Sequence, residues 1–310
     1  MPTQIELLKK HGFQIRGNMG QHLLIDPNMQ RKIVDFLSPG PQDKILEIGP
    51  GLGALTGEIL KRGAAVIAVE KDPRFIPVLR EELSGYGDKF KIIQADVLET
   101  DLSVILRPEA EESPKRSFAQ RSSPLGSLRM THASHSNFKV ISNLPYYITA
   151  PILLKLVEAR EFFSEAVLTM QKEVAQRLAA FPGTKHYGRL TLAVRYGAEV
   201  GPGFDIPKSC FAPAPEVDSS VLRLIFHSKT DLLKPREEKF LFDLIRTGFA
   251  QRRKTFLNLL CQDPRTGLGR EELLAVFKSL GFSQKVRGEE LLLKDFMALA
   301  AKLKKRVQRE

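Results

Sequence analysis

The stretch Lys44–Thr56, K-I-L-E-I-G-P-G-L-G-A-L-T, decides the fold. Its apolar run over Ile45–Ile48 predicts a buried strand of a parallel sheet. Glycines then stand at every second position, Gly49, Gly51 and Gly53, and helical spacing begins directly after them. Glycine lets a ligand approach the backbone closely, and a helix N-terminus offers unpaired N–H groups. The strand, turn and helix therefore predict one side of a nucleotide-binding crevice.

An acidic residue at a suitable distance supports this interpretation. A second strand is expected at Ala65–Val69, and Glu70 ends it, 21 positions after Gly49. In crevices of this kind, a carboxylate at about this distance binds the ribose hydroxyls. The turn reads G-x-G-x-G rather than the G-x-G-x-x-G of dinucleotide enzymes, and a glycine turn kept only for packing is the alternative. The presence of Glu70 favours a nucleotide-type ligand.

Composition and charge limit the class of partner. The 310 residues include 47 Lys and Arg against 36 Asp and Glu, and the net charge of +11 favours a polyanion such as nucleic acid. A protein with a merely basic surface is the alternative. No apolar stretch is long enough for a bilayer and the first residues lack a secretion signal, so we expect a cytoplasmic protein with no membrane partner. Cys210 and Cys261 are too few for a zinc site, and we expect no metal.

Strands and helices alternate at the spacing of an α/β fold with a doubly wound, Rossmann-like parallel sheet. Further strands are expected at Phe90–Ala95, Val140–Ser142, Ala166–Met170 and Val217–Phe226. Helices are expected at Met29–Leu37, Ala54–Lys61, Phe75–Leu83, Ala150–Arg160 and Lys172–Phe181. Ligands of such sheets bind at the carboxyl ends of the strands. Because Glu70, Asp96 and Asn143 each follow a predicted strand, we expect them to line one crevice.

Two domains and one insertion are expected. Residues 1–228 form the sheet domain, with a basic lead-in at 1–31 that contains an ordered loop and then a helix start at Asp26-Pro27. Residues 107–137 hold three prolines, seven serines and mixed charge, and they predict a surface insertion. Residues 229–310 predict a small all-helical domain, with helical stretches at Glu237–Cys261, Arg270–Leu280 and Glu289–Val307.

The tetrapeptide Asn143-Leu144-Pro145-Tyr146 is expected to face the glycine turn. On its own it has the composition of a proline turn with a packing tyrosine. Beside a G-x-G-x-G crevice it indicates an amino-methyltransferase. The exocyclic amine of adenine is a poor nucleophile because its lone pair is delocalised into the ring, and an Asn side-chain oxygen with a main-chain carbonyl held by proline can accept both amine hydrogens. A tyrosine face can stack on a base taken out of its helix, and a sulfonium methyl donor needs no metal.

With these motifs in order, the chain resembles the ribosomal RNA adenine N6,N6-dimethyltransferase family, and most of all its bacterial small-subunit (KsgA-type) members. The resemblance runs from about residue 17 to residue 260. Besides Glu70, the matching segments are G-Q-H-L-L-I-D (Gly20–Asp26), E-I-G-P-G-L-G-A-L-T (Glu47–Thr56), Ala95-Asp96, N-L-P-Y-Y (Asn143–Tyr147), Q-K-E-V-A-Q-R (Gln171–Arg177), Y-G-R-L (Tyr187–Leu190), F-A-P-A-P-E-V-D-S (Phe211–Ser219) and Q-R-R-K-T (Gln251–Thr255).

The resemblance implies S-adenosylmethionine as the cofactor, with Glu70 on the ribose hydroxyls and Asp96 on the adenine amine. The family positions that would hold the cofactor correspond to His22, Leu24, Gly49, Gly51, Glu70, Asp96 and Asn143. His22 and Leu24 match a loop that closes over the cofactor, although the family usually has Asn where His22 stands. The insertion at 107–137 is also longer than the family pattern implies.

The resemblance implies a substrate as well. It implies dimethylation of two adjacent adenosines in the 3′-terminal hairpin of 16S rRNA, with the assembling 30S subunit as partner, by an enzyme expected to be a monomer. The catalytic element would be Asn143, Leu144, Pro145 and Tyr146, with Tyr146 stacking on the target base. Phe211 matches a second aromatic residue near that base.

A basic cluster is expected to contact the RNA. Arg252, Arg253 and Lys254 are predicted to lie, with Arg246, on the first helix of the C-terminal domain. A solvated helix face is the ordinary explanation of such a run. In a protein of net charge +11 with a base-modifying site, we expect these side chains to contact RNA phosphates instead.

Three other functions remain open at this point. A non-catalytic rRNA-binding assembly or transcription factor could keep the same fold, but the intact glycine turn and N-L-P-Y favour an active enzyme. A resistance-type relative would dimethylate an adenosine of 23S rRNA, and the F-A-P-A-P-E-V-D-S segment favours the small-subunit enzyme. An NAD-dependent oxidoreductase needs a hydride-transfer site, for which the sequence offers no candidate.

Overall fold

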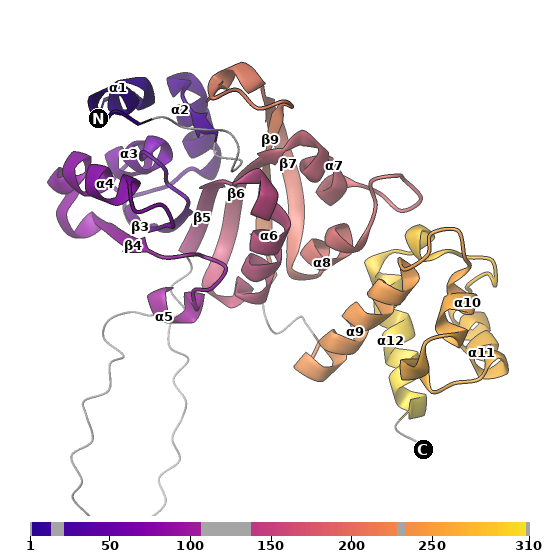
Figure 1. The fold of residues 1–310 in the computed structure, drawn as a ribbon. Coiled ribbons are helices and arrows are strands. Elements are labelled where there is room, and N and C mark those ends of the chain that lie inside the picture. Colours follow the sequence, from indigo (N-terminus) through magenta and orange to yellow (C-terminus); the bar gives the residue numbers. More distant parts are fainter. Residues whose placement is uncertain (1, 14–21, 107–137, 228–232, 308–310) are drawn as a thin grey trace, which may run out of the picture.

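The computed structural model describes residues 2–13, 22–106, 138–227 and 233–307. The insertion predicted at 107–137, most of the loop predicted before Asp26 and the predicted domain boundary at 228 lie outside them. Figure 1 shows a sheet covered by helices on both faces, followed by a cluster of helices that ends the chain. Within the described ranges, no helix combines the length and the apolar character needed to cross a bilayer.

A seven-stranded sheet organises the first part, in the order β4-β3-β2-β5-β6-β9-β7. Its strands are β2 (Lys44–Ile48), β3 (Ala65–Glu70), β4 (Phe90–Gln94), β5 (Phe138–Asn143), β6 (Phe163–Gln171), β7 (Ala198–Ile206) and β9 (Ser219–Phe226). The five strands from β4 to β6 pair in parallel, which confirms the doubly wound α/β prediction. The strand predicted at Val217–Phe226 is present as β9, but it runs antiparallel to both of its neighbours.

The sequence does not predict the edge strand β7, because Gly201, Pro202 and Gly203 interrupt its pattern. Proline has no N–H for the ladder, and it is tolerated at the edge of a sheet. The register between β7 and β9 shifts between Val200 and Gly203. A Cβ at Gly203 would lie only 1.7 Å from the carbonyl oxygen of Val221. Glycine therefore lets this edge strand approach β9.

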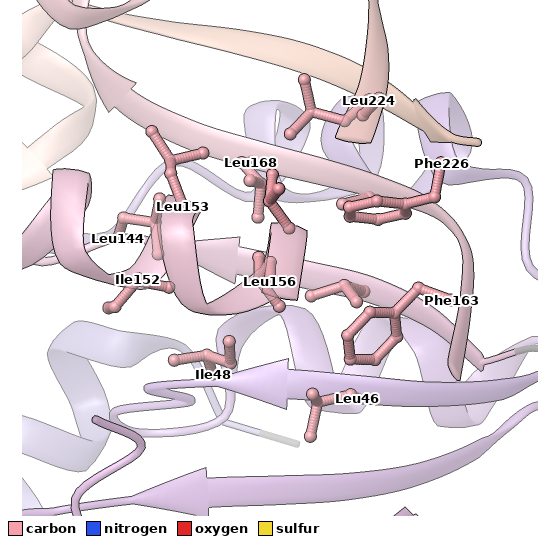
Figure 2. Packing of buried hydrophobic residues seen from close by; sticks show 14 of the residues in the cluster. Leu46, Ile48, Leu144, Ile152, Leu153, Leu156, Phe163, Leu168, Leu224 and Phe226 are labelled. Carbon is pink, nitrogen blue, oxygen red and sulfur yellow. The ribbon is translucent and has the colours of Figure 1, made fainter. Parts of the chain in front are cut away.

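Helices cover both faces of the sheet. One face carries α1 (Gln4–Lys10), α2 (Pro27–Leu37), α3 (Ala54–Lys61) and α4 (Phe75–Glu82), and the other carries α5 (Leu102–Leu106), α6 (Thr149–Glu158), α7 (Lys172–Ala179) and α8 (Arg189–Gly197). Alternate side chains of β2 divide between these faces. Leu46 and Ile48 pack with Ile152 and Leu156 of α6, as Figure 2 shows, whereas Ile45 belongs to the core on the α3 side. The central strands are therefore buried on both faces.

The segment before α2 is tied to a distant part of the chain. As predicted, Asp26 caps α2 through Oδ1, which accepts the Met29 N–H at 2.8 Å, and Pro27 occupies the first turn. Directly before this cap, β1 (Leu23–Leu24) pairs antiparallel with β8 (Phe211–Ala212). The N-terminal segment is therefore fixed against the segment that leads into β9.

The helical part consists of α9 (Pro235–Gly248), α10 (Phe256–Cys261), α11 (Arg270–Leu280) and α12 (Leu293–Val307). The prediction of one helix over Glu237–Cys261 is wrong, because a non-helical turn separates α9 from α10. A crossing segment accounts for the break. A Cβ at Gly288 would lie 2.3 Å from the Gly248 carbonyl oxygen, and the Phe256 N–H donates to the Val286 carbonyl at 2.8 Å.

The core of the helical part extends into the sheet domain. Tyr187, Leu192 and Tyr196, from α8 and the loop before it, pack in the same cluster as Leu244 and Phe296. The Tyr187 hydroxyl also donates to the Leu291 carbonyl at 2.8 Å. The predicted division near residue 228 therefore separates two stretches of sequence that share one buried cluster.

Candidate active site

The glycine turn follows β2 at the carboxyl edge of the sheet. Gly49, Gly51 and Gly53 all have positive φ, at 67°, 57° and 78°. Residues other than glycine rarely adopt this backbone conformation. The Gly49 N–H donates to the Val69 carbonyl at 2.9 Å and so joins the ends of β2 and β3. Apart from its two chain neighbours, no described residue has an atom within 4 Å of a Cβ built on Gly49. The turn therefore offers open backbone of the kind a ligand could approach.

Glu70 stands where the sequence predicts, at the end of β3 and beside the turn. Its two carboxylate oxygens accept backbone N–H groups, from Gly51 at 3.0 Å and from Asp72 at 2.8 Å. Burial raises the pKa of Glu70, and these two N–H groups oppose that shift. The carboxylate is thus fixed in place between the turn and the next loop.

Asp96 lies two residues beyond the end of β4, the neighbour of β3. Its Oδ1 accepts the Leu98 N–H at 2.9 Å, and its Oδ2 pairs with the Lys71 ammonium at 2.7 Å. The hydrogen bond from Lys71 holds the pKa of Asp96 below its usual range. The sequence did not single out Lys71, although it directly follows Glu70. A neutral amine that binds Asp96 would share this carboxylate with the lysine.

Asn143 ends β5, the strand on the other side of β2 from β3. Its Nδ2 donates to the His22 carbonyl at 2.9 Å, which joins the N-terminal segment to the tetrapeptide. The Leu144 side chain is buried, and its N–H donates to the Thr169 carbonyl at 3.0 Å. The Pro145 carbonyl accepts both the Ile148 N–H and the Thr149 hydroxyl. The tetrapeptide is therefore held by hydrogen bonds to the N-terminal segment, to β6 and to the residues that follow it.

Tyr146 is held by its hydroxyl and by its ring. The hydroxyl lies 2.7 Å from Ser219 Oγ, and burial raises the pKa of the phenol. The ring stacks with the His22 imidazole, with 5.1 Å between centroids and 29° between planes. His22 Nδ1 lies 2.7 Å from the Pro213 carbonyl oxygen. Since that carbonyl can only accept, Nδ1 carries the hydrogen.

Two other predicted site residues belong to the core. Leu24 and Phe211 are paired across the β1–β8 ladder, and both side chains are buried. Their cluster also contains Leu52 of the glycine turn. The structure thus gives Phe211 a packing role, and a base could reach its ring only if neighbouring side chains moved.

Three buried hydrogen bonds around the turn involve residues that sequence reasoning missed. Glu47 accepts the Thr56 hydroxyl at 2.6 Å, and burial raises the pKa of Glu47 to about 7. The Ser142 hydroxyl donates to the Ile48 carbonyl at 2.6 Å, and Gln4 Nε2 donates to the Leu52 carbonyl at 3.2 Å. Their spacing in the sequence carries no signal of these contacts. The sequence points to Glu47 and Thr56 only as the ends of the glycine motif.

The predicted basic cluster is not on a helix. Arg252, Arg253 and Lys254 lie in the exposed turn between α9 and α10, which corrects the sequence prediction. Arg252 is tied to the sheet domain, because its guanidinium donates to the Lys185 and Tyr187 carbonyls at 3.1 and 2.7 Å. The turn borders a groove of about 1310 Å³ between α6, α8 and α9. Among the residues that the structure describes, no group of three or more His, Cys, Asp or Glu side chains could hold a metal ion.

Comparisons with known proteins agree with one another. A family model described as "Ribosomal RNA adenine dimethylase" matches residues 12–280. Proteins named "Ribosomal RNA small subunit methyltransferase A" from Bacillus cytotoxicus and from a Geobacillus species are each 38% identical to this chain over 296 residues. The matches span 95% of this chain and 93% and 94% of those relatives.

Two solved structures share the fold. A dimethyladenosine transferase from Plasmodium falciparum gives a TM-score of 0.73 at 24% identity, covering 92% of this chain and 98% of that one. The 23S rRNA methyltransferase ErmE gives 0.62 at 23% identity, covering 91% and 99%. The likeness confirms the predicted fold class, a class I methyltransferase sheet with a helical C-terminal part.

Proposed function

Because the chain belongs to the ribosomal RNA adenine dimethylase family, and is thus an S-adenosylmethionine-dependent rRNA methyltransferase, we propose that its substrate is the rRNA of the small ribosomal subunit. The finer proposal is that it adds two methyl groups to the N6 amines of each of two adjacent adenosines in the 3′-terminal hairpin of 16S rRNA. The relatives named as small-subunit methyltransferases, at 38% identity over nearly the whole chain, support this choice. Such a substrate implies a cytoplasmic enzyme, and we propose that it acts as a monomer on the assembling 30S particle.

One observation carries the proposal. The glycine turn follows β2, while Glu70 ends β3 and Asn143 ends β5. These three strands are parallel neighbours, so all three features lie at one carboxyl edge. The open backbone at Gly49 and the fixed Glu70 carboxylate suit a nucleoside with free ribose hydroxyls. Asp96, beside Glu70, has the carboxylate oxygens that an adenine amine requires. When bound there, S-adenosylmethionine supplies a methyl group carried on a sulfonium.

The tetrapeptide prepares the target amine. Asn143 Nδ2 is used by the His22 carbonyl, so its Oδ1 is oriented as the acceptor for one amine hydrogen. We assign the second amine hydrogen to the Leu144 carbonyl, because the Pro145 carbonyl already has two donors. Accepting both hydrogens localises the nitrogen lone pair. Tyr146 supplies the aromatic face on which the base stacks.

Transfer of labelled methyl groups tests this proposal. Wild-type protein is incubated with labelled S-adenosylmethionine and either undermethylated 30S particles or 23S rRNA. We expect label in 16S rRNA as N6,N6-dimethyladenosine, and a rate at least about 100-fold lower for Asn143→Ala. Asn28→Ala, which removes an exposed amide on α2, is the matched control and should keep the wild-type rate. Label on 23S rRNA alone would replace the proposed substrate.

A further inference from the structure

We propose that Ser219 and His22 are positioning residues that fix the Tyr146 ring, so that the target adenine stacks on the ring face that His22 leaves uncovered. The inference rests on the proposed function. It goes beyond it by assigning a role to the F-A-P-A-P-E-V-D-S segment, which supplies both the Ser219 hydroxyl and the Pro213 carbonyl that holds His22. A stacking ring helps catalysis only if its plane is held, because misplacement of a substrate by about 1 Å can cost about 100-fold in rate.

Ser219 is a rigid anchor for the Tyr146 hydroxyl. It is fully buried in β9, where its backbone pairs with Gln171 of β6 on one side and Ile206 of β7 on the other. Pairing on both sides fixes the Ser219 backbone, and the 2.7 Å contact with Ser219 Oγ fixes the position of the Tyr146 hydroxyl. This bond sets the direction of the ring at the carboxyl end of β5.

His22 holds the same ring from one face. Two hydrogen bonds fix its position, from Nδ1 to the Pro213 carbonyl and from Asn143 Nδ2 to the His22 carbonyl. The β1–β8 pairing of the next two residues holds its backbone as well. With its backbone held on both sides and its imidazole held at Nδ1, His22 is a support, and not a temporary substitute for the base. At 5.1 Å between centroids, its ring covers one face of Tyr146. The incoming adenine therefore stacks on the other face.

Ser219→Ala tests the hydroxyl contact, with Ser220→Ala as the matched control. Ser220 is the next residue of the same strand, it is also buried, and its hydroxyl donates to Asp205 Oδ1 at 2.6 Å instead. At saturating cofactor and 30S particles, we expect Ser219→Ala to lower kcat about tenfold without changing cofactor affinity. Ser220→Ala should keep the wild-type kcat. Ser219→Thr keeps a hydroxyl at this position, so its kcat should be close to that of wild type.

The Tyr146→Phe variant provides a test that does not depend on the stability of the Ser219 variants. It removes the same hydrogen bond from the other side while keeping the ring. If Ser219 acts through the phenol, Ser219→Ala lowers kcat no further in the Tyr146→Phe background. Additive losses, or a Ser219→Ala enzyme as fast as Ser220→Ala, would overturn the role of Ser219.

His22 variants test which face the base uses. We expect His22→Ala to lower kcat, and His22→Phe, which keeps a ring against Tyr146, to recover part of it. If His22→Ala instead lowers KM for 30S particles or raises kcat, the imidazole occupies the face that the base needs, and the inference is wrong. Wild-type protein that transfers no methyl group would refute the proposed function itself, so the two failures are distinguishable.

Discussion

Glu47 is the buried carboxyl at the centre of the glycine motif. Its side chain accepts the Thr56 hydroxyl, and burial raises the pKa of Glu47 from 4.5 to about 7. A carboxyl whose pKa is raised by folding prefers to be protonated in the folded state. Its contribution to stability is therefore complete below pH 4.5 and is lost as the pH rises through 7.

Replacing Glu47 by Gln should remove this pH dependence. A shift from 4.5 to about 7 corresponds to a loss of about 3 kcal/mol in the free energy of unfolding at high pH. Glu47→Gln has no charge to bury, so it should be more stable than wild type at pH 8. Urea unfolding at pH 5 and pH 8 measures the difference. The exposed-carboxyl variant Glu173→Gln is the control, and an equal pH dependence in Glu47→Gln and wild type would contradict this account.

The sequence predicts where a single residue lies when that residue's place follows from the strand directly before it. Glu70 and Asn143 end strands, and the end of a strand can be predicted from the apolar run before it. It did not identify the Ser142 contact with Ile48 or the Lys71 pair with Asp96. Those partners depend on which strands become neighbours in the sheet, and that information is not local in sequence.

At the scale of elements, alanine substitutions in the glycine turn can distinguish backbone strain from loss of ligand contact. Gly49 and Gly183 both have positive φ, at 67° and 80°. Apart from the chain neighbours of each glycine, no described residue has an atom within 4 Å of an added Cβ. Replacing either glycine by Ala should therefore lower the free energy of unfolding by about 1 kcal/mol. Only Gly49→Ala adds a methyl group in the proposed cofactor site, and calorimetric titration should show its affinity for S-adenosylmethionine lowered about tenfold or more. Equal affinities in the two variants would argue against that site.

Elements were predictable where one periodicity dominates and less so where tertiary contacts override it. The strands β2 to β6 and the helix α2 with its Asp26 cap follow local rules. The break between α9 and α10 follows from the close approach of Gly288 to Gly248, which no local pattern reveals. The two-residue β1–β8 ladder is likewise too short for a periodic signal, yet it holds His22 in the site.

At the scale of the whole molecule, the basic turn before α10 has two kinds of residue. Arg252 is bonded to the Lys185 and Tyr187 carbonyls and lies 3.5 Å from the Glu289 carboxylate, so it joins the helical part to the sheet domain. The Arg253 and Lys254 side chains are exposed. The first residue thus stabilises the arrangement of the two parts, and the other two are suited to contact phosphates.

The two roles can be separated by salt dependence. Binding of Arg253→Ala/Lys254→Ala to 16S rRNA, measured over a range of salt, should be weaker, with a slope lower by about 1 for each phosphate that the variant no longer neutralises. Arg252→Ala should mainly lower Tm, because it leaves two carbonyls without their donor. Lys44→Ala serves as the control, because it removes an exposed charge at the start of β2, the end away from the glycine turn. A double variant with the slope of Lys44→Ala would refute the phosphate contacts.

The overall architecture followed from the order of motifs, whereas the joining of its two parts did not. The sequence predicts a domain boundary at residue 228, but Tyr187 and Tyr196, which precede it, pack with the helical core that follows it. Glu238 adds polar contacts at the same junction. Its Oε2 accepts hydrogen bonds from the Arg160 guanidinium and from the Tyr196 hydroxyl, each at 3.3 Å. Residues so far apart in the chain give no shared pattern from which their contact could be predicted.

A crystal structure of the protein with bound S-adenosylmethionine tests the central claim most directly. We expect the adenine amine at Asp96, the ribose hydroxyls at Glu70, and the methyl group directed toward Asn143 Oδ1. A donor bound away from Glu70 and Asp96, or an Asn143 side chain turned away from the methyl group into the core, would contradict the account.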